Sequence, residues 1–267
     1  LTDAIVGPTD ISLGDNHTCA INGEGAVYCW GSNNGNALGI DGGSTATAVL
    51  ALAAPAVAEK VVAGDSHSCA LAAGVASCWG NNDAGQLGDG TQTSPAAATA
   101  VAVALPELAI PTALTAGSSH TCALVEGGDV FCWGANSSGQ LGLPDADDVV
   151  PGPTLVALPA AASAIVAAER TTCAVLADST VYCWGENSYQ QIGLEPDTRD
   201  TATPTEIVGV TASALSVSNS HVCATTTDGT IQCWGDNTYT ELGSDRVAAA
   251  STPTPTELQC TAAASGE

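Results

Sequence analysis

A segment of about 50 residues occurs five times in this chain of 267 residues, and no other feature constrains the fold as strongly. Each copy holds two cysteines nine or ten residues apart, and the first cysteine recurs after 50, 53, 51 and 50 residues. All five tryptophans directly follow the second cysteine, and all four histidines stand two residues before the first. The cysteine pairs are Cys19 with Cys29, Cys69 with Cys78, Cys122 with Cys132, Cys173 with Cys183 and Cys223 with Cys233. Because such units bury their apolar faces against one another, we expect a single domain over residues 1–267.

Each repeat contains signals for four strands. A short run rich in β-branched residues, such as Lys60–Gly64, precedes the first cysteine and predicts an inner strand. A tight turn with Gly or Asp near its tip separates the two cysteines, so each unit contains a hairpin. A nine-residue turn bounded by glycines follows each tryptophan, and its asparagine can cap it through the side chain. A proline-bearing outer strand, such as 203–207, completes the unit.

We place the repeats at approximately 11–58, 59–112, 113–162, 163–212 and 213–257, with terminal strands at 1–10 and 253–267. The stretch Pro255–Glu257 aligns with Pro204–Glu206, which predicts that the C-terminus begins a sixth unit. The terminal strands either close a five-membered ring within one chain or add to a neighbouring chain, which would give a head-to-tail filament. The eleventh cysteine, Cys260, has no partner in the repeat and is a candidate for a cross-link between chains.

The cysteine pairs admit two chemical interpretations. In a hairpin centred on the turn, the two cysteines face each other at about 4.5 Å between Cα atoms, within reach of a disulfide. Alternatively, His17, Cys19 and Cys29 supply three ligands for zinc. Repeat four favours the disulfide, because Thr171 replaces the histidine while both cysteines are kept. The histidines are then structural hydrogen-bonding groups rather than catalytic bases.

Charge and cysteine content limit the partners and the compartment. Four Lys and Arg residues against 28 Asp and Glu residues give a net charge of −24, which disfavours binding to nucleic acid. Paired cysteines at this density indicate an oxidising compartment. The chain has no methionine and no apolar leader, so we expect a mature protein that is secreted or held at the cell surface. No run of about 18 apolar residues occurs, so we expect no membrane span.

Acidic residues follow the nine-residue turns and should gather on one face of the array. Calcium could bind there, but no loop has ligand spacing as specific as an EF-hand, so we expect no metal or other cofactor. The acids considered are Asp145, Asp147, Asp148, Glu195, Asp197 and Asp200.

Three motifs recur in register: His-x-Cys-Ala-Leu, Gly-x-Val-Tyr-Cys-Trp-Gly and Gly-x-Asn-x-x-Gly-Gln-Leu-Gly. Their order resembles the repeat of the regulator of chromosome condensation family, most of all its secreted, bacterial, cysteine-containing branch, over nearly the whole chain. The resemblance implies an all-β propeller with one four-stranded blade per repeat. The family's propellers usually have seven blades, whereas this chain has five repeats. Nucleotide exchange on a nuclear GTPase is not carried over, because this chain is acidic, rich in paired cysteines and without a long insertion.

Two classes of function agree with these observations. The first is a secreted or cell-surface module that binds a protein or a glycan through a propeller face. The second is an extracellular structural protein that assembles with itself through its terminal strands. We expect no enzymatic activity, because no catalytic triad, recurring carboxylate pair or metal motif stands out from the repeat.

Overall fold

The computed structural model describes residues 5–52, 57–93, 99–194, 200–243 and 249–256. Over these residues the regular structure is β apart from one 3-10 turn, η1 (Asn34–Asn36), and no helix is long enough to cross a membrane. Each of the first three repeats forms one sheet of four antiparallel strands, in sequence order from the inner to the outer edge. Their strands are β1 (Asp10–Leu13), β2 (His17–Ile21), β3 (Val27–Gly31), β4 (Thr45–Leu52), β5 (Ala58–Ala63), β6 (His67–Ala72), β7 (Val75–Gly80), β8 (Val101–Ala102), β9 (Pro111–Ala116), β10 (His120–Val125), β11 (Val130–Ala135) and β12 (Val149–Leu155).

The fourth and fifth blades share one long strand, β16 (Thr201–Val217), so together they form a single seven-stranded sheet. The first part of β16 pairs with β15 as the outer strand of blade 4, and residues 212–217 pair with β17 as the inner strand of blade 5. The remaining strands are β13 (Ala162–Ala168), β14 (Thr171–Leu176), β15 (Thr180–Gly185), β17 (His221–Thr226), β18 (Ile231–Gly235) and β19 (Ala250–Pro255). The expected all-β architecture with one four-stranded blade per repeat is therefore confirmed.

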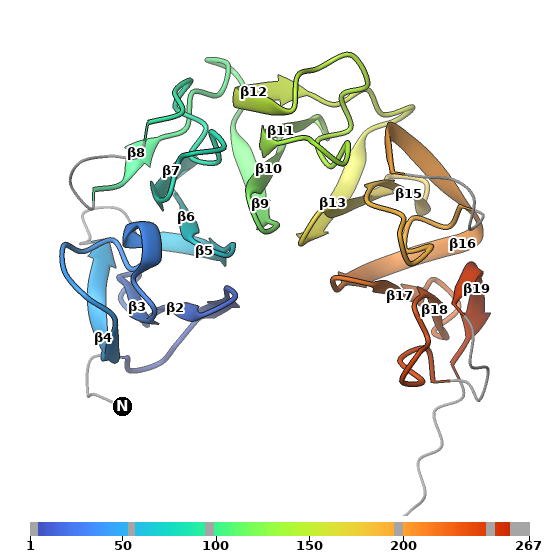
Figure 1. The fold of residues 1–267 in the computed structure, drawn as a ribbon, viewed down its shortest axis with the longest axis horizontal. Helices are drawn as coiled ribbons and strands as arrows, with labels where there is room; N and C mark the ends of the chain where they lie inside the picture. Colours follow the sequence, from blue (N-terminus) through green and yellow to red (C-terminus); the bar gives the residue numbers. More distant parts are fainter. Residues whose placement is uncertain (1–4, 53–56, 94–98, 195–199, 244–248, 257–267) are drawn as a thin grey trace, which may run out of the picture.

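The five blades lie in an open arc with their inner strands toward the centre (Figure 1). Blade 1 and blade 5 stand at the two ends of this arc, and a gap separates them. Closure of the ring by a terminal strand, one of the two arrangements expected, is not found among the described residues. Blade 1 already has β4 of its own repeat beside β3, and β19 pairs with β18 as the fourth strand of blade 5.

The terminal segments differ from their expected roles. Of the predicted strand 1–10, residues 5–9 lie outside any strand and β1 begins only at Asp10. At the other end, Thr254 faces Cys233 as Thr205 faces Cys183, so Thr254 is the counterpart of Thr205. The sequence alignment was therefore wrong by two residues, and the segment from residue 253 begins within blade 5 rather than in a sixth unit. Cys260 lies outside the described residues.

A disulfide joins the two central strands of every blade, as the sequence predicts. The two half-cystines of each pair face each other in the strand register, with Cα atoms 4.0 to 4.1 Å apart. The bridges join Cys19 to Cys29, Cys69 to Cys78, Cys122 to Cys132, Cys173 to Cys183 and Cys223 to Cys233. All but one of these ten half-cystines are buried. The zinc interpretation is excluded for them, because their sulfur atoms are bonded to one another.

Repeat two has a shorter loop between its cysteines, and a two-residue turn still places Cys69 directly opposite Cys78. Ala73 and Gly74 form this turn, and both have positive φ. The two-residue turn expected there is therefore confirmed.

The second half-cystine also marks an irregularity that the sequence did not predict. In blade 3, the register between β11 and the outer strand β12 shifts between Cys132 and Gly134. Cys132 faces Thr154, whereas Gly134 faces Val150, so the outer strand holds two more residues than the strand beside it over this interval. The corresponding shift follows Cys29, Cys183 and Cys233 in blades 1, 4 and 5. The outer strand of these blades is thus bulged, and such a bulge increases the local twist.

The hydrophobic core lies between consecutive blades rather than within one. Four clusters of buried side chains fill the four junctions, and each contains the tryptophan of the later blade. Trp79, Trp133, Trp184 and Trp234 are fully buried. The prediction that tryptophans pack between blades is confirmed for these four. Trp30 of blade 1 has no preceding blade in the arc and stays partly exposed.

Replacing the buried pair in blade 2 by Cys69→Ala and Cys78→Ala should lower the free energy of unfolding by about 3 kcal/mol, because the loop that the bridge closes regains its freedom in the unfolded chain. Chemical denaturation would measure this loss. Reduced wild-type protein is the matched control and should lose more stability than the variant, because five bridges are then opened. An unchanged unfolding free energy in both would contradict a stabilising role.

Candidate functional site

The inner ends of all five blades surround a hollow at the centre of the arc, with a volume of about 490 Å³. Each inner strand stops at a short turn, and the residue two places before the histidine position marks the rim of this hollow. These rim residues are Asp15, Asp65, Ser118, Glu169 and Asn219, one from each blade. Three of the five carry a carboxyl group, so the hollow is an acidic site.

Backbone contacts between neighbouring blades fix the rim. The Asp65 amide donates to the Ser118 carbonyl at 3.1 Å, and the Ser118 amide and hydroxyl both donate to the Glu169 carbonyl, at 2.9 and 3.1 Å. Glycine precedes the rim residue in the first three blades because the backbone of the next blade and the histidine ring of the same blade leave no room for a side chain. A Cβ atom on Gly117, for example, would lie 2.5 Å from the Glu169 carbonyl oxygen. These bonds hold the rim turns of blades 2, 3 and 4 together.

The acids of the rim stand in an unfavourable electrostatic environment. Burial raises the pKa of Asp65, and the charge of Asp15 raises it further, while Arg170 opposes both effects. Burial also raises the pKa of Glu169, again with the charges of Asp65 and Asp15 adding to it. A bound cation would relieve this repulsion, so the hollow suits a positively charged group.

The sequence interpretation missed this recurring set of carboxyl groups. Their common position, two residues before the histidine position, is visible in the repeat, but nothing local shows that blades 50 residues apart meet at one centre. The acids considered for calcium lie elsewhere. Asp145, Asp147 and Asp148 are exposed, Asp200 accepts a hydrogen bond from the Asn187 amide, and Glu195 and Asp197 lie outside the described residues. In the described parts of the chain, no three His, Cys, Asp or Glu side chains are grouped as metal ligands.

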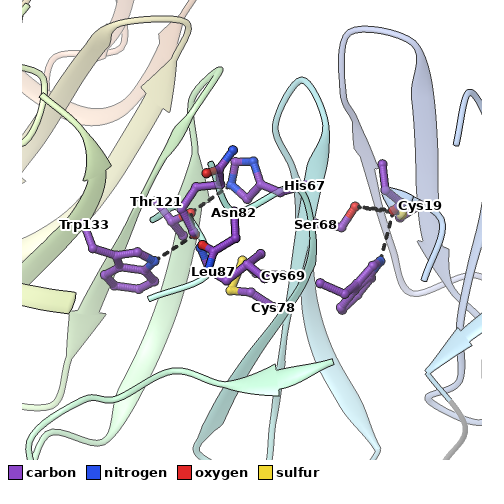
Figure 2. Close-up of a disulfide and its surroundings, with 12 residues drawn as sticks. Cys19, His67, Ser68, Cys69, Cys78, Asn82, Leu87, Thr121 and Trp133 are labelled. Carbon is purple, nitrogen blue, oxygen red and sulfur yellow. Dashed lines mark hydrogen bonds between the residues drawn. A yellow bond between two sulfur atoms is a disulfide. The ribbon is translucent and has the colours of Figure 1, made fainter. Parts of the chain in front are cut away.

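Three histidines lie directly behind the rim and bond to the next blade along the chain (Figure 2 shows His67 and Thr121). In each case Nε2 lies within hydrogen-bonding distance of the hydroxyl that precedes the first cysteine of that blade. The pairs are His17 with Ser68 at 2.8 Å, His67 with Thr121 at 2.9 Å and His120 with Thr172 at 2.8 Å.

The same hydroxyl groups donate to a carbonyl in the nine-residue turn of the preceding blade, which also accepts the indole N–H of the following tryptophan. Thr121 Oγ1 and Trp133 Nε1 both lie 3.0 Å from the Gln86 carbonyl oxygen. The carbonyls of Ala37 and Gln140 receive the corresponding pairs, Ser68 with Trp79 and Thr172 with Trp184. We call this set of histidine, hydroxyl, carbonyl and tryptophan the junction lock.

The asparagine at the third position of each nine-residue turn holds that carbonyl in place. Asn82 Oδ1 accepts a hydrogen bond from the Leu87 amide at 3.0 Å, directly after the carbonyl of Gln86. In the four other turns the equivalent bond is accepted by Asn33, Asn136, Asn187 and Asn237. The predicted capping role of these asparagines is confirmed.

The lock fixes the state of the histidines. Because each hydroxyl donates its only hydrogen to the carbonyl, it must accept from a protonated Nε2, which leaves Nδ1 without a proton. The Nδ1 atoms of His17, His67 and His120 have no hydrogen-bond partner among the described residues. Burial lowers the pKa of His67 to about 3 and that of His120 to about 4. These histidines are neutral structural groups at pH 7, as their repeat position indicated.

The junction between blades 4 and 5 lacks both halves of the histidine–hydroxyl pair. Thr171 stands where the histidine would be, and Val222 stands where the hydroxyl would be. Val222 is fully buried in the apolar cluster of this junction. The Trp234 indole still donates to the Gln191 carbonyl at 2.9 Å. Histidine and hydroxyl are therefore present together at three junctions and absent together at the fourth.

Fold and site together define an open array of disulfide-bridged propeller blades around an acidic centre. A family model described as an RCC1-like domain matches residues 2–266, and the chain belongs to this family. It is 36% identical to the X-linked retinitis pigmentosa GTPase regulator of Canis lupus familiaris over 53% of its length, and 30% identical to the ultraviolet-B receptor UVR8 of Arabidopsis thaliana over 74%. The chain spans only 14% and 45% of those two relatives.

Solved structures show the same fold. The structure of human WBSCR16 superposes with a TM-score of 0.84 and 18% identity, and the match covers 96% of this chain and 67% of the WBSCR16 chain. Yeast RCC1 (Prp20) bound to Kap60 superposes with a TM-score of 0.79 and 22% identity, and the match covers 94% of this chain and 64% of the yeast chain. This likeness concerns the fold alone. The five blades thus correspond to about two thirds of these longer propellers.

Thr121→Val should cost about 1 to 3 kcal/mol of unfolding free energy, because it leaves the buried Nε2–H of His67 without an acceptor. The double variant His67→Thr with Thr121→Val reproduces the pair found between blades 4 and 5 and should be less destabilised than the sum of its single variants. Chemical denaturation of the four proteins would measure this coupling. Strict additivity would contradict the lock.

The buried histidines also predict a pH dependence. Folding lowers the pKa of His67 from 6.5 to about 3 and that of His120 from 6.5 to about 4. Their contribution to the free energy of unfolding is therefore complete above pH 6.5 and is lost as the pH falls toward these lowered pKa values. The raised pKa values of Asp65 and Glu169 have the opposite effect and increase the stability as the pH falls. The effect of the histidine is therefore measured as the difference in stability between two proteins that both keep these acids. The stability gap between wild type and the His67→Thr, Thr121→Val variant, measured from pH 7 to pH 4, should shift in favour of the variant. A constant gap would contradict the assignment.

Proposed function

We propose that this chain is an extracellular protein-interaction module without catalytic activity, and that it receives a positively charged segment of its partner in the acidic hollow. Membership in the RCC1-like family supports the general role, because propellers of this family are typically interaction modules. Five disulfides support a site of action in an oxidising compartment, either secreted or at the cell surface.

The single observation that carries the proposal is that Asp15, Asp65 and Glu169, from three different blades, line one hollow. Residues on loops that a rigid scaffold positions are frequent binding residues. The whole chain carries a net charge of −24, which adds a long-range attraction for a basic partner. A cationic protein segment fits this site better than a neutral glycan does.

Two exposed aromatic side chains lie in turns that are bonded to the rim turns. Tyr189 and Tyr239 occupy the same position in the nine-residue turns of blades 4 and 5, and they are 46% and 84% exposed. Backbone bonds from Glu186 to Arg170 and from Asp236 to Ser220 tie these turns to the rim turns of the same blades. Exposed tyrosines are enriched at protein interfaces, so this side of the hollow would contact the partner beyond its charged group.

Self-assembly through exchanged terminal strands is the weaker candidate. The described part of the C-terminal segment is already used inside blade 5, where β19 pairs with β18. The cross-link through Cys260 stays a prediction, which non-reducing gels of wild type and Cys260→Ser would check.

The variant Asp15→Asn, Asp65→Asn, Glu169→Gln should weaken binding of a lysine-rich peptide about tenfold or more at low salt, because it removes the charges that converge on the hollow. The matched control Asp145→Asn, Asp147→Asn, Asp148→Asn removes the same number of charges from an exposed loop. Calorimetric titration would measure both. An equal loss in the two variants would mean that only net charge acts, which would refute the hollow as the site.

A further inference from the structure

One dipeptide sets the nine-residue turn of blade 1 apart from its four counterparts. The fourth and fifth positions of this turn hold Asn34 and Gly35. The other turns hold Asp-Ala, Ser-Ser, Ser-Tyr and Thr-Tyr there, at residues 83–84, 137–138, 188–189 and 238–239. An asparagine side chain followed by glycine is open to attack by the backbone, because glycine has no side chain to obstruct the approach. The turn of blade 1 thus carries a chemically reactive pair that the other turns lack.

The local structure leaves this pair accessible. Asn34 and Gly35 are both exposed, and Gly35 has φ 61° and ψ 19°, which interrupts the 3-10 turn η1 at its centre. The Asn34 amide donates to Ser32 Oγ at 3.4 Å, and the Asn34 carbonyl accepts from the Ala37 amide at 3.2 Å. These bonds, the ones that the described residues give Asn34, use neither its carboxamide nor the Gly35 amide. The two groups that would react are therefore not held apart by hydrogen bonds.

A second Asn-Gly pair, in the hairpin of blade 1, has the opposite environment. Asn22 is buried, and its Oδ1 accepts from the amides of Glu24 and Ala26 at 3.1 and 2.9 Å. The Gly23 amide donates to the Val6 carbonyl at 2.9 Å. This pair must lose all three bonds before it can react, which requires local opening of the hairpin. The chain therefore contains a matched control for the exposed pair.

We propose that Asn34 is a site of spontaneous deamidation, with water as the co-reactant. The deprotonated Gly35 amide nitrogen attacks Cγ of Asn34, the new C–N bond closes a succinimide ring, and the carboxamide nitrogen takes up a proton and leaves as ammonia. Water then adds to one of the two ring carbonyls and breaks its bond to the ring nitrogen. One opening gives aspartate, and the other gives isoaspartate, in which the backbone runs through the side chain.

No atom is oxidised or reduced in this sequence, and either product weighs about 1 Da more than asparagine. Neither Asn34 nor Gly35 lines the acidic hollow, so the modification does not depend on the proposed function.

The modified turn belongs to the junction between blades 1 and 2. Its Ala37 carbonyl accepts the Ser68 hydroxyl and the Trp79 indole N–H. Gly35 packs so closely against blade 2 that a Cβ atom on it would lie 2.7 Å from Cβ of Asn81. Isoaspartate lengthens the backbone by a methylene group beside this contact, which leaves little room for the extra atoms. We therefore expect isoaspartate to displace the Ala37 carbonyl and loosen the junction, whereas aspartate keeps the original backbone path.

Mass spectrometry of aged protein tests the site. The chain with its five disulfides intact is incubated in mildly alkaline buffer, which favours the deprotonated Gly35 amide. Samples are then reduced, alkylated and cut after Glu24, which puts Asn22 and Asn34 on separate peptides. Labelling by protein isoaspartate methyltransferase distinguishes isoaspartate from aspartate. A reduced, unfolded sample is aged in parallel, because both Asn-Gly pairs are then exposed.

In the folded protein, the Asn34 peptide should gain about 1 Da at least about tenfold faster than the Asn22 peptide, because only Asn22 needs local opening to react. In the unfolded sample the two rates should be similar. Equal rates in the folded protein would overturn the proposal. So would an Asn34 peptide that stays intact in the folded protein while its unfolded counterpart reacts.

Denaturation of the same samples tests the effect on the junction. Aged wild type that contains isoaspartate should unfold at a lower denaturant concentration than fresh protein. Asn34→Gln, aged for the same time, controls for other damage, and Asn34→Asp controls for the added charge alone. Both variants should keep the midpoint of fresh wild type. An unchanged midpoint in protein rich in isoaspartate would refute the weakening of the junction.

Discussion

A single buried carbonyl group at each junction decides how the blades of this protein meet. The carbonyls of Ala37, Gln86 and Gln140 belong to buried residues between two blades, and each accepts an indole N–H and a hydroxyl from the next blade. An unpaired carbonyl at such a place would cost as much as a lost hydrogen bond. The tryptophan is therefore fixed by its polar atom as well as by its large apolar surface.

The part of the fold that rests on neighbouring residues was predictable from the sequence. A disulfide across a hairpin needs only the spacing of Cys69 and Cys78 and the turn between them, and the asparagine caps act within five residues. The contacts of His67 with Thr121 could not be read in this way, because the two residues are far apart in the chain and only the packing of blades brings them together. The bulge beyond Cys132 was missed because it depends on how the outer strand twists against its neighbour. Ring closure is not found among the described residues, because β19, which holds the first residues of the strand assigned to closure, is the outer strand of blade 5.

The loss of both lock residues between blades 4 and 5 shows how the lock works as a unit. If only the hydroxyl were replaced by Val222, a histidine opposite it would keep a buried N–H without an acceptor. Replacing both restores a junction without unpaired polar atoms, with an apolar cluster in place of the hydrogen bonds. Histidine and hydroxyl are therefore kept or replaced as a pair. The disulfide of repeat four does not take part in this pair, so it is kept although the histidine is missing.

The acidic hollow is compatible with stability only because the rest of the molecule is so constrained. Asp65 and Glu169 are partly buried beside like charges, which disfavours the folded state whenever they are ionised. Repulsion between these acids would be relieved if the rim turns moved apart. The backbone bonds between Asp65, Ser118 and Glu169 and the junction locks behind them oppose such a movement. Such a frame keeps the repelling carboxyl groups around one hollow before any ligand arrives. A cationic group that enters the hollow then gains the electrostatic energy without the cost of assembling the site, which is the advantage of a preorganised binding surface.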